Sequence, residues 1–148
     1  MSRTGRAAVV MLQNHEGKYL VVWNRRYGGF SFPGGRVEEG ETTDAAALRE
    51  LGEETGIRAI GSPELVFEGS HGITVDVTRG STVSVFRVAY YEGVATEMEQ
   101  GCPVTWWTRE EFLKWSPFAV FYVRVFAALS ARSEYFGRAL AALSKSEK

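Results

Sequence analysis

Three glutamates near the middle of the chain have the spacing of a shared helix face. Glu50, Glu53 and Glu54 stand at relative positions i, i+3 and i+4, and on an α-helix these positions lie within an arc of roughly 100°. Carboxylates placed so closely repel one another and would weaken an isolated helix. Clustered oxygen ligands are, however, what a hard divalent cation binds. The spacing therefore predicts an acidic helix face with Mg²⁺ (or Mn²⁺) as its cofactor.

The other side of the same helix is apolar. Ala47, Leu48 and Leu51 point to nearly the opposite direction from the glutamates, so the helix is expected to pack its back against a core. Thr42 or Thr43 is expected to cap its start, and Gly56 stands where a C′ glycine ends a helix. A solvated acidic face without a ligand is the alternative interpretation of the glutamate cluster.

The whole segment from Gly35 to Ile57 has a fixed pattern. It reads GRVEEGETTDAAALRELGEETGI and fits G-x5-E-x7-R-E-U-x-E-E-x-G-U, where U is a bulky aliphatic residue. The fixed places are occupied by Gly35, Glu41, Arg49, Glu50, Leu51, Glu53, Glu54, Gly56 and Ile57. This pattern is the Nudix box, and the chain resembles the Nudix hydrolase family. A merely solvated acidic helix would not account for the flanking glycines or for Arg49.

The resemblance implies a fold, a reaction and roles for the acidic residues. The family has an α/β fold, an α/β/α sandwich built on a mixed β-sheet. Its members hydrolyse a diphosphate linkage in a nucleoside diphosphate joined to another group. The glutamates that match Glu53 and Glu54 are metal ligands, and the one that matches Glu50 is a ligand or the general base. The backbone carbonyl of Gly35 is expected to complete the coordination.

Further acidic residues are expected to support these ligands. The resemblance implies that Arg49 pairs with a carboxylate such as Glu41, which would hold the preceding loop against the helix and orient the ligands. Some family members add a carboxylate from a loop before a Trp-bearing strand. Glu99, which precedes Trp106 and Trp107, is the preferred candidate for that ligand or base. A solvated loop charge is the alternative for Glu99.

Four residues are candidates for binding the substrate. Arg25 and Arg26 follow the second expected strand, and one of them could clamp a phosphate; a solvated surface pair is the alternative. Gly34 precedes Gly35, and a backbone without Cβ atoms can approach a metal-bound phosphate closely. Phe32 is one of several aromatic residues that could stack on a base, although a core position is the alternative.

Composition bounds the kind of protein. The chain has 148 residues with 45% hydrophobic and 24% charged residues, which predicts a single globular domain; the resemblance implies that this is one Nudix domain over residues 1–148. The formal charge of −1 gives no general attraction to polymeric nucleic acid, so a small nucleotide is the expected partner. Cys102 is the only cysteine, so an intrachain disulfide is excluded and a cytoplasmic location is expected. No apolar run is long enough to span a bilayer.

Hydrophobic patterning and turn residues predict the order of the elements. Two strands, 7–12 and 19–23, form a hairpin that turns at Glu16 and Gly17, and residues 70–81 form a second hairpin loop. Thr108 and Glu111 form a capping box that opens a short helix to Trp115. A helical extension over about 117–148 follows, with one helix from Pro117 and a last one over 133–143, which could cover the domain or form a homodimer face. The other strands are expected at 30–32, 64–69, 82–91 and 104–107.

The choice of substrate depends on weaker signals. The SQPWPFP-like stretch of NADH pyrophosphatases is absent, and no proline lies about sixteen residues beyond the box, as it often does in ADP-ribose hydrolases. The short build looks most like the MutT-type group, which implies a nucleoside triphosphate pyrophosphohydrolase that releases a monophosphate and pyrophosphate, with oxidised nucleotides among the candidate substrates. The alternatives are ADP-ribose, a nucleotide sugar, a dinucleoside polyphosphate or an RNA 5′ end. A non-catalytic nucleotide sensor is a further alternative.

Overall fold

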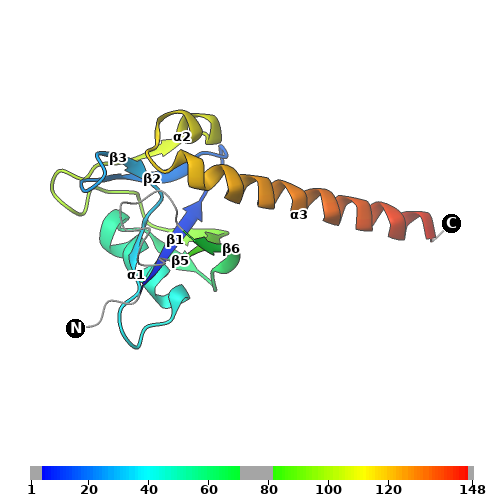
Figure 1. Cartoon of the computed structure of the whole chain (residues 1–148), viewed down its shortest axis with the longest axis horizontal. Coiled ribbons are helices and arrows are strands. Elements are labelled where there is room, and N and C mark those ends of the chain that lie inside the picture. The colour runs from blue at the N-terminus through cyan, green and yellow to red at the C-terminus, as the bar shows by residue number, and fades with distance from the viewer. Residues whose placement is uncertain (1–4, 71–81, 147–148) are drawn as a thin grey trace.

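The computed structural model describes residues 5–70 and 82–146 of the chain. Strands and helices alternate along it, and the longest helix comes last (Figure 1). The predicted hairpin loop at 70–81 lies outside the described residues except for Ser70. The strands are β1 (Arg6–Leu12), β2 (Tyr19–Asn24), β3 (Gly29–Ser31), β4 (Gly34–Arg36), β5 (Arg58–Ile60), β6 (Glu64–Ser70), β7 (Thr82–Val88), β8 (Tyr90–Glu92) and β9 (Val104–Trp107). The helices are α1 (Thr43–Thr55), α2 (Arg109–Trp115) and α3 (Ala119–Ser146).

The largest sheet is mixed. Its strand order is β4-β1-β7-β6, and β1 pairs with β7 in parallel while the other pairs are antiparallel. A second sheet has the order β3-β2-β9, and β5 pairs with β8 in a small third sheet. β1 lies between β4 and β7. It therefore joins β4, the glycine-containing strand that precedes α1 in the chain, to the rest of the large sheet.

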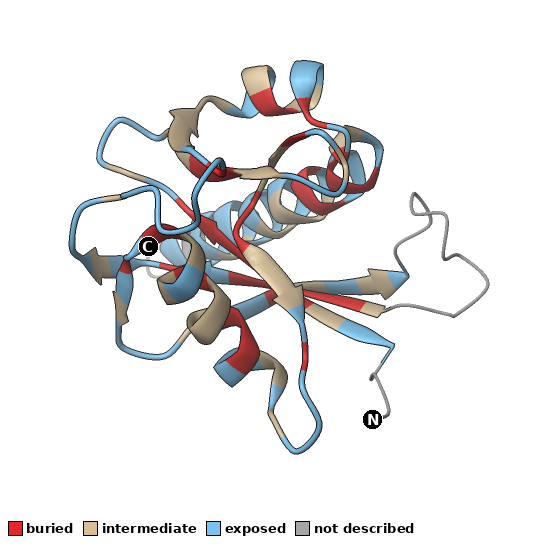
Figure 2. Ribbon diagram, turned by 90° about the vertical axis from the view of Figure 1, so that its left-hand side faces the viewer, coloured by how far each residue is buried: buried red, intermediate tan, exposed pale blue. Residues whose placement is uncertain are grey.

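Helices cover both faces of the large sheet. On one face, Ala46, Ala47 and Leu51 of α1 are fully buried in a cluster that includes Val10 of β1 and Phe86 of β7. On the other face, residues of α2 and the first half of α3 pack with the inward side chains of the strands (Figure 2). Successive side chains of a strand point to opposite faces, so each central strand contributes to both clusters. This arrangement confirms the predicted α/β/α sandwich with a mixed sheet.

Several strand boundaries differ from the prediction. β1 and β2 share only the bridge between Gln13 and Tyr19 before they diverge into two sheets, so they do not form the expected hairpin. Gly34 begins strand β4, where only a turn was expected. The predicted strand 82–91 is interrupted at Ala89, and its end pairs as β8 with β5, which the sequence did not reveal.

The carboxyl-terminal extension contains one long helix rather than the two predicted helices. α3 runs without a break from Ala119 to Ser146. Its second half contains no proline and is rich in residues of high helix propensity, and a single Gly137 weakens a helix without ending it. In Figure 1 this second half extends well beyond the sheets. Within residues 5–70 and 82–146, no helix combines the length and apolar character that a membrane crossing requires.

Candidate active site

Helix α1 begins and ends where its sequence predicts. The Thr42 hydroxyl accepts a hydrogen bond from the Ala45 N–H at 3.3 Å and caps the first turn. Gly56 has a φ of +74°, a left-handed conformation that favours glycine, and its N–H donates to the Gly52 carbonyl. Since the apolar side of α1 is buried against β1, the glutamate side faces away from that core.

Glu54 is the most constrained of the three glutamates. Its carboxylate accepts a hydrogen bond from the Gly34 N–H at 2.7 Å, which joins α1 to β4. Burial of the carboxylate raises its pKa to about 8, against the lowering effect of the Gly34 hydrogen bond. The negative charges of Glu50, Glu99 and Glu53 raise this pKa further. A carboxyl group held in this setting is costly to ionise unless a cation lies beside it.

Glu50 lies directly against the glycine strand. A Cβ atom added at Gly35 would come within 2.5 Å of the Glu50 Oε1 atom, so only glycine leaves room for this carboxylate. Burial raises the pKa of Glu50, although the adjacent Arg49 guanidinium lowers it. The negative charges of Glu53 and Glu99 also raise the pKa of Glu50. The arrangement of the site therefore depends on the absence of a side chain at Gly35 as well as on the glutamates.

Arg49 joins the loop and the acidic face. Its guanidinium donates to both carboxylate oxygens of Glu41, at 2.8 and 3.0 Å, and to the Arg36 carbonyl at 3.0 Å. The Nη1 atom also donates to Glu50 Oε1 at 3.0 Å and to Glu53 Oε2 at 3.2 Å. The expected pairing of Arg49 with Glu41 is therefore present. The Arg49 hydrogen bonds lower the Glu41 pKa to about 2.

A loop between β8 and β9 brings a further carboxylate toward α1. Glu99 is exposed on this loop, and its charge contributes to the raised pKa values of both Glu50 and Glu54. The loop is held by the Arg25 guanidinium, which donates to the Gln100 carbonyl and lies 3.5 Å from the Cys102 Sγ atom. The loop also closes on itself, because the Cys102 N–H donates to the Glu99 carbonyl at 2.9 Å.

Comparison with known proteins assigns this arrangement to a family. A family model described as the NUDIX domain matches residues 3–131. The chain belongs to the NUDIX family. The match includes the whole segment from Gly35 to Ile57, which contains β4 from Gly35 on and all of α1.

Individual relatives match shorter parts of the chain. It is 33% identical over 96 residues to a MutT-like protein of Streptomyces ambofaciens, covering 65% of this chain and 58% of that protein. It is 34% identical over 101 residues to an 8-oxo-dGTP diphosphatase of Proteus vulgaris, covering 66% of this chain and 87% of that protein. An RNA pyrophosphohydrolase of Shewanella sediminis is 55% identical over 40 residues, which cover 26% of this chain and 23% of that protein. The first and last of these matches span less than two thirds of the relative.

Solved structures share the fold. The solution structure of the E. coli ORF135 protein is 26% identical to this chain, with a TM-score of 0.64, and the match covers 86% of this chain and 91% of the other. A MutT protein from Methanosarcina mazei Go1 has the same TM-score of 0.64 at 19% identity, covering 86% of this chain and 94% of the other. At that lower identity the likeness concerns the fold alone.

The structure gives three of the four expected substrate-binding residues other contacts. Phe32 is 2% exposed, and its ring stacks on Phe112 with a centroid distance of 4.1 Å. This core position does not fit the expected contact with substrate, because no face of the ring is open to a base. Arg25 holds the Glu99 loop rather than projecting toward a phosphate, and Arg26 is exposed with its guanidinium 5.4 Å from the Tyr27 ring centroid. Gly34 remains at the site, where its N–H donates to Glu54.

The NUDIX box residues fit a divalent metal by their chemistry. Among residues 5–70 and 82–146, no three acidic, His or Cys side chains converge closely enough to form a ready metal-binding group. Glu50 and Glu53 instead turn toward Arg49 on the shared helix face. The buried Glu54 carboxylate, the space at Gly35 and the all-oxygen donor set nevertheless suit a hard cation. Glu50, Glu53, Glu54 and the Gly35 carbonyl are the groups available to hold it.

The sequence did not predict the contacts between residues that are far apart in the chain but hold the site together. Arg25 and Gln100 are separated by 75 residues in the chain, and nothing in the local pattern of either segment indicates their hydrogen bond. The hydrogen bond from the Gly34 N–H to Glu54 spans 20 residues. The adjacent glycines Gly34 and Gly35 in the stretch FPGG were a signal for this second contact, because a backbone without Cβ atoms can lie close to α1.

Proposed function

We propose that this chain hydrolyses the diphosphate linkage of a nucleotide in a reaction that depends on Mg²⁺ or Mn²⁺. The preferred substrate is a ribo- or deoxyribonucleoside triphosphate, and the products are the monophosphate and pyrophosphate. The observation that carries this proposal is the acidic face of α1 packed against the Gly34–Gly35 backbone, with Glu54 held by the Gly34 N–H. This face offers both oxygen ligands and a backbone that a phosphate can approach.

The residues of the site have separate tasks in this proposal. Glu53, Glu54 and the Gly35 carbonyl would hold the divalent ion, which would neutralise phosphoryl charge and lower the pKa of a bound water. Glu50 would act as a further ligand or as the base that takes the proton of that water. Glu99, carried on the loop that Arg25 holds, is a second candidate for the base. Arg49 would keep the carboxylates oriented through its contacts with Glu41, Glu50 and Glu53.

The relatives favour a small nucleotide as substrate. The Proteus vulgaris relative is named an 8-oxo-dGTP diphosphatase, and its match extends over 66% of this chain. Oxidised deoxynucleoside triphosphates are therefore candidate substrates. The RNA pyrophosphohydrolase matches are shorter, and the formal charge of −1 supplies no broad attraction for RNA. An RNA 5′ end is the second candidate because of these matches.

A product assay on a substrate panel tests the proposal. The panel contains the ribo- and deoxyribonucleoside triphosphates, 8-oxo-dGTP, ADP-ribose, a nucleotide sugar, a dinucleoside polyphosphate and a 5′-triphosphorylated RNA. We expect pyrophosphate and a monophosphate from a triphosphate in the presence of Mg²⁺, and loss of turnover in EDTA that Mg²⁺ or Mn²⁺ restores. Orthophosphate as the first product, or full turnover in EDTA, would contradict the proposal. Nucleotide binding without turnover of any substrate would instead favour a sensor.

A further inference from the structure

The second half of α3 carries large apolar side chains that are mostly exposed. Tyr135, Phe136, Leu140 and Leu143 are 70%, 58%, 67% and 62% exposed. Figure 1 shows this part of the helix extending away from the sheets. A helix of this length without tertiary contacts is only marginally stable in water, because helix stability comes mainly from a packed face. An uncovered apolar face on such a helix indicates a docking surface.

Three of these side chains continue the core stripe of the same helix. Phe118, just before α3, and Tyr122 and Val125 in its first half are at most 8% exposed and belong to one core cluster. At about 100° per residue, Phe136 and Leu140 fall on the same side of the helix as those core residues. The full stripe runs through Phe118, Tyr122, Val125, Leu129, Phe136, Leu140 and Leu143. One continuous face therefore changes from buried to exposed where the helix leaves the sheet.

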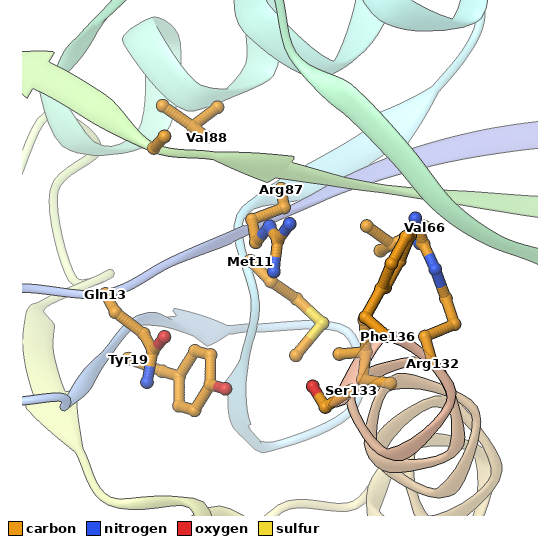
Figure 3. Close-up of a pocket in the computed structure, with 11 residues that line it drawn as sticks. Met11, Gln13, Tyr19, Val66, Arg87, Val88, Arg132, Ser133 and Phe136 are labelled. Atoms are coloured by element: carbon orange, nitrogen blue, oxygen red, sulfur yellow. The ribbon is translucent and has the colours of Figure 1, made fainter. Parts of the chain in front are cut away.

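A pocket lies at the point of this change. It has a volume of about 290 Å³ and is lined on one side by Met11 and Tyr19 and on the other by Leu129, Ser133 and Phe136 of α3. Figure 3 shows Met11 of β1 on one side of the pocket, with Ser133 and Phe136 on the facing helix. Gln13, Arg87 and Arg132 also line it, so this partly polar opening has room for a side chain from another molecule.

Arg132 lies at the pocket wall and is ion-paired there. Its Nη2 atom lies 3.0 Å from Glu64 Oε1 on β6, and Arg87 Nη2 lies 2.8 Å from the other oxygen of Glu64. These ion pairs hold the Arg132 guanidinium at Glu64 of β6. Between Leu129 and Phe136, the stripe is bordered by Arg132 and contains the small Ser133.

We propose that the second half of α3 pairs antiparallel with the same segment of a second copy of this chain. Leu129 and Leu143 each stand seven residues from Phe136, so these three positions of the stripe are symmetric about Phe136. A two-fold axis at Phe136 places the two Phe136 rings together. It also places the Leu143 of each copy opposite the Leu129 of the other, at the pocket, and the Leu140 of each copy opposite the Arg132 of the other. Such an isologous contact covers Leu129, Phe136 and Leu143 in both copies.

The size of the stripe is consistent with this occupant. A stable interface buries about 800 Å² on each partner, and a large aromatic side chain alone supplies roughly 150–250 Å². The four exposed side chains of the stripe and its flank, Tyr135, Phe136, Leu140 and Leu143, together with the pocket walls, supply an area of this order.

The opposite side of the helix favours a second copy over a membrane surface. There Glu134 and Arg138 are 70% and 83% exposed in their side chains and lie 3.9 Å apart as an i, i+4 ion pair. This pair is neutral overall, whereas helices that lie on anionic lipid present a polar face rich in Lys and Arg. An ion pair of opposite charges across from an apolar stripe is the pattern of a helix that pairs with another helix.

The oligomeric state of the full chain tests the pairing. We expect a dimer in sedimentation equilibrium, and we expect Phe136→Glu to raise its dissociation constant by about 30-fold, as loss of a central contact does. Ala141→Glu is the matched control, because it introduces the same charge on the other side of the helix and should leave dimerisation unchanged. Circular dichroism of both variants checks that the fold is retained. A monomer at every concentration, or a dimer that Phe136→Glu leaves intact, would overturn the proposal.

Engineered cysteines test the antiparallel register. Phe136→Cys should form an intermolecular disulfide under mild oxidation, and a mixture of Leu129→Cys and Leu143→Cys proteins should form the mixed disulfide. Leu143→Cys alone should not cross-link, and the wild-type chain is a control because Cys102 is buried. Efficient cross-linking of Leu143→Cys alone would indicate parallel pairing and overturn the register. Binding of a monomer to phosphatidylcholine–phosphatidylglycerol vesicles would overturn the choice of partner. None of these readouts depends on hydrolase activity.

Discussion

The three glutamates of α1 differ in their surroundings, although the sequence presents them as equals. Glu54 is partly buried and accepts the Gly34 N–H, whereas the Glu53 side chain is 55% exposed and lies against Arg49. Glu50 is intermediate, with a side chain 17% exposed against the glycine strand. A metal ion would therefore meet one carboxylate that is already fixed and others that must leave Arg49 to reach it. We infer that Glu54 anchors the site and that Glu53 and Glu50 complete it.

Neutralising either presumed ligand should abolish most of the activity without unfolding the chain. We expect Glu53→Gln and Glu54→Gln to lower kcat by about two or more orders of magnitude, because each removes a charge that holds the metal. Glutamine keeps the size of the side chain and, at position 54, an oxygen that can still accept the Gly34 N–H. Glu16→Gln, in the turn before β2, is the control. Turnover at the wild-type rate in both variants would remove these residues from the mechanism.

The raised pKa of Glu54 predicts a pH dependence of stability in the metal-free protein. Its pKa is about 8 in the fold and 4.5 as a model value, so between these values the folded state holds a proton that the unfolded chain has lost. The free energy of unfolding must then fall as the pH rises through this window. We expect the Tm of EDTA-treated protein to decrease from about pH 5 to about pH 8, and Glu54→Gln to flatten the slope.

A second carboxyl group acts in the opposite direction at lower pH. The pKa of Glu41 is lowered to about 2 from 4.5, so its contribution to stability is present above pH 4.5 and is lost as the pH falls toward 2. The test of Glu54 is therefore made above pH 5, where Glu41 is ionised in both states. A Tm that stays level or rises from pH 5 to pH 8 would contradict the assigned burial of Glu54.

At the scale of elements, two adjacent glycines of β4 have different reasons to be glycine. A Cβ atom at Gly34 would come within 2.5 Å of the Ala8 carbonyl oxygen, which belongs to the backbone of β1. At Gly35 the neighbour is the flexible end of the Glu50 side chain, also at 2.5 Å. The first contact concerns the pairing of two strands, and the second concerns the position of a candidate ligand.

Alanine substitutions should separate these two effects. We expect Gly34→Ala to destabilise the fold by about 1–3 kcal/mol, because the β1–β4 backbone must shift. Gly35→Ala should change Tm little but lower kcat about tenfold or more, because the Glu50 carboxylate is displaced. Thermal unfolding and steady-state kinetics of both variants measure the difference. Equal losses of stability in the two variants would contradict this division.

The loop that carries Glu99 is held by a residue that sequence alone suggested for substrate binding. Arg25 donates to the Gln100 carbonyl and lies near Cys102, so we expect Arg25→Ala to lower kcat while KM changes little. A phosphate clamp would give the reverse result, a raised KM with a smaller change in kcat. Arg25→Lys should recover only part of the rate, because an ammonium group lacks the guanidinium geometry that reaches both partners.

The elements that sequence predicted well are those whose signals are local. The caps of α1 and the capping box of α2 are specified within a few residues, and both are present. The partition of β1 and β2 into different sheets was missed, because strand partners come from distant segments. The sequence left the role of Phe32 undecided for the same reason. Its partner Phe112 comes from a distant segment, and periodicity does not distinguish a core aromatic residue from one that stacks on a base. The acidic face was predictable because a single helix carries it.

At the scale of the whole molecule, α3 connects the core of the domain with a surface outside it. Its first half is fixed by Phe121, Tyr122 and Val125 in the same cluster as the sheet residues. Its second half has the same stripe but lacks a covering element within residues 5–70 and 82–146. The two halves should therefore respond differently to dilution, because only the second depends on a partner molecule.

Amide hydrogen exchange of the full chain at several protein concentrations measures this difference. Protection over residues 119–129 should be the same at every concentration, because intramolecular packing supports it. Protection over residues 130–146 should fall as the protein is diluted, since an unsupported helix of this length opens readily. Phe136→Glu should give the diluted pattern at all concentrations, whereas Ala141→Glu should behave as the wild type. If both halves of α3 were equally protected at high dilution, the second half would be stable by itself and would not require a second copy.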